Sequence, residues 1–349
     1  MRGKAAVLKV TLGIALVVAL FVGLAFAQTK TLIGASCFPL KSPLGKYGIV
    51  SWAEKVEAMS GGRLKIRLHE PGEIVPATEV LDAVRKGVVD VGMNTPAWQK
   101  GEFPAGDLFY TLPGGVFDFH DLFVWMYSGE GIKLQQEMYK GAVVAFPLGL
   151  TPPEEIWSTK PVKTLEDIKG LKIRAAGLSM ELWKALGASV VLLPAGEVIP
   201  ALRRGLIDAA EFAYPSMDYA LGLHEVAKYL FNPPIHMGSN MFQLLINPKV
   251  WDGLAPDLKE IIKNAAIAAT IEGYCQAWVD SMEAFEKIKQ AGVQMTKLSP
   301  EDQKKAKEIA FKILEEKAKE DEYFKKVWES QKRFLEKIRP FYEFSKFDI

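Results

Sequence analysis

Two residues of opposite charge stand at the ends of short apolar segments in the stretch 171–229. Arg174 closes the segment 171–174, and Glu211 closes the segment 206–211. A guanidinium presents a rigid fork of donors that matches a carboxylate, and it keeps its charge at any relevant pH. A carboxylate buried without a partner is costly, so Glu211 needs Arg174, a cation or a ligand hydroxyl. The pair indicates a site for an organic acid, with a structural salt bridge as the alternative.

Five more side chains are candidates for the same site. Phe212 directly follows the glutamate, and Asn94 and Trp98 begin a stretch rich in glycine and proline. We expect Asn94 and Trp98 to close over a bound ligand, with burial in its own half of the molecule as the alternative for the Trp98 ring. Glu154 and Trp157 stand where the chain is expected to enter its second half. A solvated loop is the alternative for Glu154.

The segments around the arginine and the glutamate alternate between strand and helix. Apolar runs predict the strands, and Gly187 and Gly205 end the helices. The predicted strands are 171–174, 189–193 and 206–211, and the predicted helices are 179–186 and 196–204. Such alternation forces a parallel sheet whose strand ends open onto a ligand crevice. The two charged residues are therefore expected at strand ends beside one cleft.

The same unit occurs earlier in the chain. Residues 79–92 align without gaps on residues 197–210, with Glu, Val, Ala, Arg, Gly and Asp identical. In each copy a glycine suits the left-handed position after a helix, and an aspartate (Asp90 or Asp208) is expected within the strand that follows. A chance likeness of two helix-strand units is the alternative. The repeat predicts two lobes of similar design, and the residues that should face each other across the cleft are 93–95 and 211–213.

The rest of the chain fits a two-lobed α/β plan. Of 349 residues, 27 belong to the N-terminal leader described below, which leaves 322, more than one ordinary core holds. A helix over 256–290 would extend ~52 Å and brace both lobes. The expected division is lobe I at 28–149 with part of 238–275, lobe II at 150–237 with part of 276–298, and C-terminal helices at 299–349.

Residues 1–27 have the pattern of a secretory signal peptide. Three basic residues precede an apolar run over 10–24, and Ala25-Phe26-Ala27 forms an A-x-A cleavage site. An uncleaved anchor is the alternative, because about 18 to 20 apolar residues can span a bilayer. Cleavage removes three positive charges and takes the formal charge from +1 to −2. The mature protein is expected in the periplasm or otherwise outside the cytoplasm, and it lacks the basic stripe of a nucleic-acid binder.

Motifs for catalysis are absent from the sequence. The four histidines are scattered, and none has the spacing of a metal site such as H-E-x-x-H. No G-x-S-x-G, G-x-x-x-x-G-K-[ST] or G-x-G-x-x-G pattern and no C-x-x-C pair is present. We therefore expect a binding protein and not an enzyme. An enzyme on a two-lobed fold and a ligand-sensing receptor are the alternatives.

Two further features concern how the chain is held together. Cys37 and Cys275 permit a disulfide outside the cytoplasm, but the sequence does not predict one. Ser299-Pro300, followed by two acids, marks a strong helix start. In the last helix an apolar stripe runs from Phe324 to Ile338, which would pack on the body of the protein or on a second subunit.

Taken together, these features resemble the solute-binding proteins of TRAP transporters, the DctP family. The resemblance covers the whole mature chain. It is carried by KIRAAG at 172–177, LPAGEV and GLIDAAE within 193–211, LGLHEVAKY at 221–229, and SQKRF and FYEF within 330–344. It implies a periplasmic receptor of two lobes that closes on a carboxylate and delivers it to a membrane permease driven by an ion gradient. By position, Arg174 matches the family's carboxylate-binding arginine.

The resemblance is nearest to the subgroup that binds 2-oxo and 2-hydroxy monocarboxylates. There, a Glu-Trp or Asp-Trp pair and a glutamine before the lobe II tryptophan hold a metal ion beside the substrate. Here the pair is Glu211-Phe212, whose second residue still has a backbone carbonyl to offer. Near the expected glutamine the chain reads TPPEEIW at 151–157, and Met237 replaces an acid. The resemblance thus implies no obligatory cofactor, with calcium or sodium beside the ligand as the alternative, and for some members a dimer that exchanges C-terminal helices.

Overall fold

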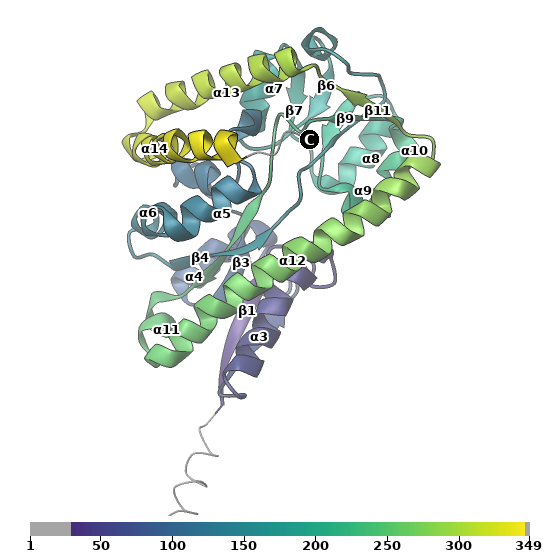
Figure 1. Ribbon diagram of the computed structural model, residues 1–349. Coiled ribbons are helices and arrows are strands. Elements are labelled where there is room, and N and C mark those ends of the chain that lie inside the picture. Colours follow the sequence, from purple (N-terminus) through teal and green to yellow (C-terminus); the bar gives the residue numbers. More distant parts are fainter. Residues whose placement is uncertain (1–28, 346–349) are drawn as a thin grey trace, which may run out of the picture.

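Two separate sheets divide the chain between two lobes, and one long helix runs along both (Figure 1). The structure is a computed structural model that describes residues 29–345, so the predicted signal peptide lies outside the described residues. The predicted two-lobed α/β fold with a bracing helix is confirmed. Within the described range, no helix combines the length and apolar character needed to cross a bilayer.

Lobe I is built on a five-stranded sheet with the order β2-β1-β3-β10-β4. The strands are β1 Lys30–Ser36, β2 Leu64–His69, β3 Val91–Asn94, β4 Val144–Leu150 and β10 Met241–Ile246. The first three are parallel, whereas β10 runs antiparallel to both β3 and β4. The sheet is therefore mixed, because β10 enters it from the other lobe.

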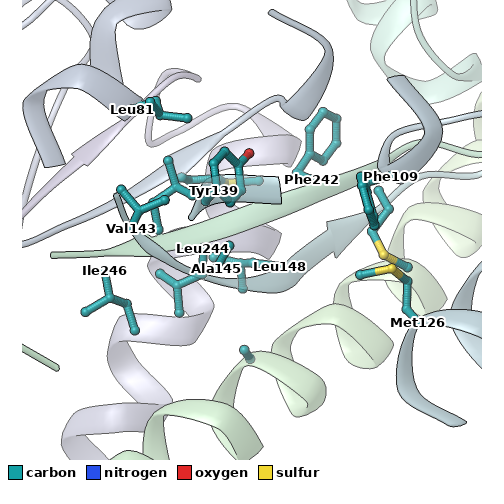
Figure 2. Close-up of a cluster of buried hydrophobic side chains, with 14 of the residues drawn as sticks. Leu81, Phe109, Met126, Tyr139, Val143, Ala145, Leu148, Phe242, Leu244 and Ile246 are labelled. Atoms are coloured by element: carbon teal, nitrogen blue, oxygen red, sulfur yellow. The ribbon is translucent and has the colours of Figure 1, made fainter. Parts of the chain in front are cut away.

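Helices pack on this sheet, with α3 against β2, α4 against β3 and α6 against β4. Apolar side chains of β4 and β10, among them Leu148 and Leu244, share a core with Tyr139 of α6 (Figure 2). A π-helical turn over 46–50 leads directly into the α-helix at 51–59. The helical elements of lobe I are α2 Pro43–Gly45, η1 Lys46–Val50, α3 Ser51–Met59, η2 Ala77–Glu79, α4 Val80–Lys86, η3 Pro96–Gln99, η4 Pro104–Phe109, η5 Pro113–Gly115, α5 Phe119–Ser128, α6 Gly131–Tyr139 and α11 Pro248–Asp252.

Lobe II is built on a six-stranded sheet with the order β11-β9-β5-β8-β6-β7. Its strands are β5 Ile156–Ser158, β6 Lys172–Arg174, β7 Ser189–Val191, β8 Ala209–Glu211, β9 Tyr229–Asn232 and β11 Gln294–Lys297. β6, β7 and β8 are parallel, as predicted, and β5 is antiparallel to β8 and β9. Its helical elements are η6 Leu165–Ile168, α7 Ser179–Ala185, α8 Ala195–Arg203, α9 Pro215–Leu221 and α10 Leu223–Val226. Arg174 and Glu211 therefore end adjacent parallel strands.

The internal repeat has the same local structure in both lobes. The glycine after α4 has a φ of 74° and the glycine after α8 a φ of 69°. Asp90 accepts a hydrogen bond from the backbone N–H of Ile33 at 2.7 Å, and Asp208 accepts one from that of Lys172 at 3.1 Å. Both aspartates come one residue before β3 or β8, and not within the strand as predicted. Each ties the approaching strand to its parallel neighbour, β1 or β6.

Three stretches of chain cross between the sheets. The first crossing segment, residues 151–155, leads from β4 to β5, and the second crossing segment, residues 233–240, leads from β9 to β10. The third is α12, Pro256–Gln290, which has the predicted bounds. It contacts β4 and α3 in lobe I and α9 in lobe II, and it runs diagonally along both lobes (Figure 1).

The last two helices also connect the lobes. The side chain of Ser299 caps α13, Pro300–Glu320, which packs into the lobe II core through Ala306 and Ala310. α14, Glu322–Ser345, places the predicted apolar stripe in the lobe I core, where Phe324 and Trp328 are buried. In this structure the stripe therefore packs on the body of the protein. Cys37, which is buried, and Cys275, which is exposed, are both free.

Candidate functional site

A cavity of about 450 Å³ lies between the lobes and is lined by both of them. Lobe I contributes mainly aromatic and small polar side chains: Phe38, Thr95, Trp98, Lys100, Tyr110 and Phe242. Lobe II contributes Arg174, Glu211, Phe212 and Tyr214, and the crossing segments contribute Thr151, Glu154 and Met237. A hollow of about 550 Å³ lies elsewhere, beside α6 and the start of α14. Only the first contains the charged strand ends, so we take it as the candidate site.

Arg174 is held by backbone carbonyl groups. Its Nη1 donates to the carbonyl oxygen of Glu211 at 2.8 Å, and its Nε donates to that of Leu193 at 3.3 Å. Its guanidinium carbon lies 5.9 Å from the centre of the Phe212 ring. Among residues 29–345, no carboxylate lies within 4.0 Å of this guanidinium. The arginine is thus oriented by neutral groups, and its charge is left for an anion in the cavity.

Glu211 is buried, and its carboxylate turns toward α7 of its own lobe. Oε1 accepts hydrogen bonds from the backbone N–H of Ala176 at 2.5 Å and from the hydroxyl of Ser179 at 2.8 Å, while Oε2 accepts one from the indole of Trp183 at 3.2 Å. Burial nevertheless raises the pKa of Glu211 to about 7, because desolvation of the charged form outweighs these donors. This carboxylate is therefore poised between its two forms near neutral pH.

His236 lies beside that carboxylate without forming an ion pair. Its Nε2 is 3.8 Å from Oε2 of Glu211, and neither ring nitrogen has a hydrogen-bond partner. Burial lowers the pKa of His236 to about 3, so the ring is neutral at physiological pH. The two groups are close enough for an ion pair, but a neutral imidazole has no charge to form one. The histidine therefore adds no positive charge beside the carboxylate of Glu211.

Glu154 brings a second acid to the cavity from the first crossing segment. It is 7 % exposed, and its Oε1 accepts a hydrogen bond from the amide of Asn240 in the second crossing segment. Burial raises the pKa of Glu154 well above the usual range, and the nearby charges of Glu211 and Asp218 raise it further. Burial and the neighbouring acids thus both disfavour the charged form of Glu154.

Two more acids lie behind the cavity wall. Asp218 of α9 is fully buried and accepts a hydrogen bond from the indole of Trp157 at 2.7 Å. Burial raises its pKa well above the usual range. Glu155 has a buried Oε2 without a partner, and burial raises its pKa to about 7. Together with Glu154 and Glu211 they give this part of the molecule more carboxyl groups than the two cations that line the cavity, Lys100 and the half-buried Arg174.

The structure brings together five of the seven predicted site residues. Arg174, Glu211, Phe212, Trp98 and Glu154 line the cavity. Two do not, and they are corrections to the expected set. Trp157 is fully buried in the lobe II core with its indole bonded to Asp218, and Asn94 is fully buried with its amide donating to Gln99 at 2.7 Å.

Sequence reasoning missed several lining residues, although some carried a usable signal. Phe38 follows β1, and Tyr214 follows Glu211 by three positions, so the rule that strand ends face the cleft would have included both. Thr151 lies in the predicted crossing. Tyr110 carried no signal beyond its place in an aromatic-rich stretch, because only the folded loop places it opposite the acids.

A hard cation such as calcium or sodium prefers oxygen ligands, and the cavity offers several of them. The carboxylates of Glu154 and Glu211, the hydroxyl of Thr151 and the backbone carbonyl of Phe212 belong to residues that line the cavity. The carboxylate of Glu211, however, already accepts three hydrogen bonds, and Met237 offers no oxygen side chain. Within residues 29–345 no cluster of three or more His, Cys, Asp or Glu side chains is arranged to hold a metal. A cation therefore fits only if ligand oxygens and backbone carbonyls complete its shell.

Solved structures of other proteins have the same overall fold as this chain. The fold superposes on a TRAP periplasmic solute-binding protein of Colwellia psychrerythraea with bound calcium and pyruvate, with a TM-score of 0.84 and 28% identity over 91% of this chain and 98% of the other. It also superposes on one of Pseudoalteromonas atlantica T6c with bound sodium and pyruvate, with a TM-score of 0.83 and 27% identity over 91% and 97%.

Sequence comparison agrees with the structural result. The chain is 34% identical over 293 residues to the monocarboxylate 2-oxoacid-binding periplasmic protein of Nostoc sp., covering 83% of this chain and 80% of the relative. Residues 35–321 match the model of the bacterial extracellular solute-binding protein family 7, DctP. The chain therefore belongs to the DctP family of extracellular solute-binding proteins.

Proposed function

We propose that this protein captures a small 2-oxo or 2-hydroxy monocarboxylate between its lobes outside the cytoplasm and presents it to a TRAP membrane permease. The observation that carries the proposal is the state of Arg174. Its guanidinium lines the cavity, is oriented by two backbone carbonyls and is not paired with an acid of the described chain. A ligand carboxylate satisfies this charge with a geometry that a fork of donors favours.

The relatives support the class of ligand. A relative from Nostoc is named for binding monocarboxylate 2-oxoacids, and two neighbours with the same fold hold pyruvate. Those two neighbours hold calcium or sodium as well. In this chain we propose that such an ion lies beside Glu211 and the Phe212 carbonyl, with Glu154 facing the same cavity. The ion would offset the negative charge that the ligand adds to two carboxyl groups.

Delivery outside the cytoplasm rests on two supports. The family is described as extracellular, and the sequence begins with the pattern of a secretory signal peptide. A permease partner follows from the transporter type of the structural neighbours. Binding and release of an unchanged acid is proposed in place of turnover, since the cavity brings an arginine and carboxyl groups together without an activated nucleophile.

A thermal-shift screen of the mature protein tests the proposal. Ligand that binds only the folded state raises the melting temperature by mass action. Pyruvate, lactate and related acids are compared with succinate and with an amino acid, each with chelator, with calcium and with sodium. We expect a rise with 2-oxo or 2-hydroxy monocarboxylates that is larger with calcium or sodium. A rise only with the amino acid would replace the proposal by a zwitterionic ligand, whose ammonium group the surplus acids would hold.

A further inference from the structure

The two crossing segments lie side by side and are tied to each other by buried hydrogen bonds. The backbone N–H of Thr151 donates to the carbonyl of Asn240 at 3.0 Å, and the hydroxyl of Thr151 accepts from the N–H of Asn240 at 3.1 Å. The hydroxyl of Ser239 donates to the Thr151 carbonyl at 2.7 Å. All three residues are at most 2 % exposed. The segments that must bend when the lobes move are therefore coupled to each other.

A further hydrogen bond between the two crossing segments involves a side chain of the cavity wall. Glu154 lines the cavity, and its Oε1 accepts the bond from the Asn240 side chain. Asn240 itself is not among the residues that line the cavity. The Thr151 hydroxyl also belongs to a residue that lines the cavity, but it accepts from a backbone N–H, whereas this bond joins two side chains, one from each crossing segment. A change at Glu154 is thus passed to a residue that the ligand does not reach.

Two backbone hydrogen bonds connect the second crossing segment, or the residue that follows it, to lobe I. The backbone N–H of Met241 donates to the carbonyl of Tyr110 at 2.9 Å, and that of Gly114 donates to the carbonyl of Ile235 at 2.6 Å. Tyr110 also lines the cavity. The second crossing segment is consequently fixed to lobe I near both of its ends. Among the bonds described above between the two crossing segments, the one from Asn240 to Glu154 joins side chain to side chain.

We propose that Glu154 is a positioning residue that transmits occupation of the cavity to the interlobe crossing through Asn240. A ligand, or an ion beside it, that contacts the Glu154 carboxyl reorients this group and with it the amide of Asn240. The spacing of the crossing segments, and so the balance of open and closed lobes, changes with it. A few residues at element ends are enough to absorb a hinge motion of this kind. This inference rests on the proposed function of the same cavity.

A double-mutant cycle tests the link, because residues that act through one another give non-additive effects. Affinity for pyruvate in the presence of calcium is measured by calorimetry for wild type, E154A, N240A and the double variant. We expect N240A to weaken binding about tenfold in the wild-type background, within the range of known coupling effects, and by less than about twofold in the E154A background. Equal losses in both backgrounds, or no loss with N240A, would overturn the proposal.

Three controls separate transmission from damage to the fold. N247A removes another buried asparagine, whose amide donates to the Val84 carbonyl in lobe I, and it should leave affinity unchanged. N240S replaces N240A if the latter does not fold. E154Q keeps an oxygen that accepts from Asn240, so it should restore most of the lobe closure that E154A loses. Lobe closure is measured by fluorescence energy transfer between two dyes. The dyes are attached to the cysteines that K86C and K163C introduce, in a protein that also carries C275S.

The outcomes also distinguish this inference from the proposed function. If the wild type binds none of the acids, the proposed function fails and the cycle has no starting point. If the wild type binds pyruvate and closes on it while N240A does so with the same affinity, the proposed function stands and the role of Glu154 is wrong. Failure of E154Q to restore closure while the cycle is non-additive would mean that the charge, and not the bond to Asn240, carries the effect, which also overturns the proposal.

Discussion

At the scale of single residues, Arg174 carries the strongest prediction. R174K keeps the positive charge but loses the planar fork and the two bonds that aim it, to the carbonyls of Leu193 and Glu211. We expect affinity for the ligand to fall by at least about tenfold, the scale of one lost charge-assisted hydrogen bond. Calorimetry with the best acid of the thermal-shift screen measures the change.

The matched control for this change is R204K. Arg204 follows α8, and its Nε also donates to a backbone carbonyl, that of Pro200 at 3.2 Å, but it does not line the cavity. R204K should bind the ligand as wild type does. Undiminished affinity in R174K would show that the carboxylate is held elsewhere.

The sequence could predict Arg174 and Glu211 because both follow apolar strands whose ends must meet at one edge of a sheet. It could not predict that Trp157 is turned away from the cavity. The partner of its indole, Asp218, lies 61 residues further along the chain, and only the packing of α9 brings the two together. The same holds for Asn94, whose amide is taken up by Gln99 in its own lobe.

At the scale of elements, the close packing of α12 on η1 explains why residue 273, inside this helix, is a glycine. A Cβ at Gly273 would lie 2.8 Å from the Tyr47 carbonyl oxygen and 3.0 Å from the Tyr47 Cβ. Tyr47 also donates from its hydroxyl to Asp280 of α12 at 2.7 Å, which fixes η1 against the helix. Helical periodicity predicts the bounds of α12 from sequence, but this close approach is visible only in the folded chain.

We therefore expect G273A to destabilise the protein by roughly 1–3 kcal/mol, as overpacking does, despite the better helix propensity of alanine. Unfolding in urea, followed by circular dichroism, measures the change. G196A is the control, since Gly196 lies in α8 with nothing within 4 Å of the added Cβ. That variant should be neutral or slightly stabilised. A stabilised G273A would mean that the packing of η1 on α12 yields at little cost.

At the scale of the whole molecule, buried carboxyl groups set the pH dependence of stability. Burial raises the pKa of Asp107, Glu155 and Glu211 to about 7 each, above their values of about 4 in an unfolded chain. Between these values the folded state holds more protons than the unfolded state, so stability falls as pH rises. His236 works in the opposite sense below about pH 6.5, because its lowered pKa keeps it neutral in the fold, but it is one group against three.

The ligand-free protein should therefore have a higher melting temperature near pH 5 than near pH 8. E155Q should flatten this dependence, since the amide has no proton to lose on that side of the cavity wall. E336Q changes an exposed acid on α14 and should leave the slope unaltered. Scanning calorimetry measures the melting temperature from pH 5 to 8. A melting temperature that rises over this range would contradict the raised pKa values of the buried acids.

The internal repeat predicts the two-lobed plan, because each copy carries the same glycine and aspartate at the same turn. The sequence could not predict how the lobes approach each other, since their approach depends on loops without a repeated pattern. Trp98 of lobe I is 42 % exposed and Leu192 of lobe II is 62 % exposed, yet both line the same cavity. When the two walls close, these large apolar side chains are removed from water, and this burial stabilises the closed state.

We expect W98A to weaken ligand binding by about tenfold or more, mainly through faster release, because the closed state loses the apolar area that the ring buries. Its ligand-free melting temperature should change little, since the ring is already exposed. Trp278 on α12 is 40 % exposed and does not line the cavity, so W278A is a control of equal size. Stopped-flow measurement of dissociation compares the two. If both variants release ligand at the wild-type rate, closure does not bring Trp98 onto the ligand, and the lobes must meet along a different rim of the cavity.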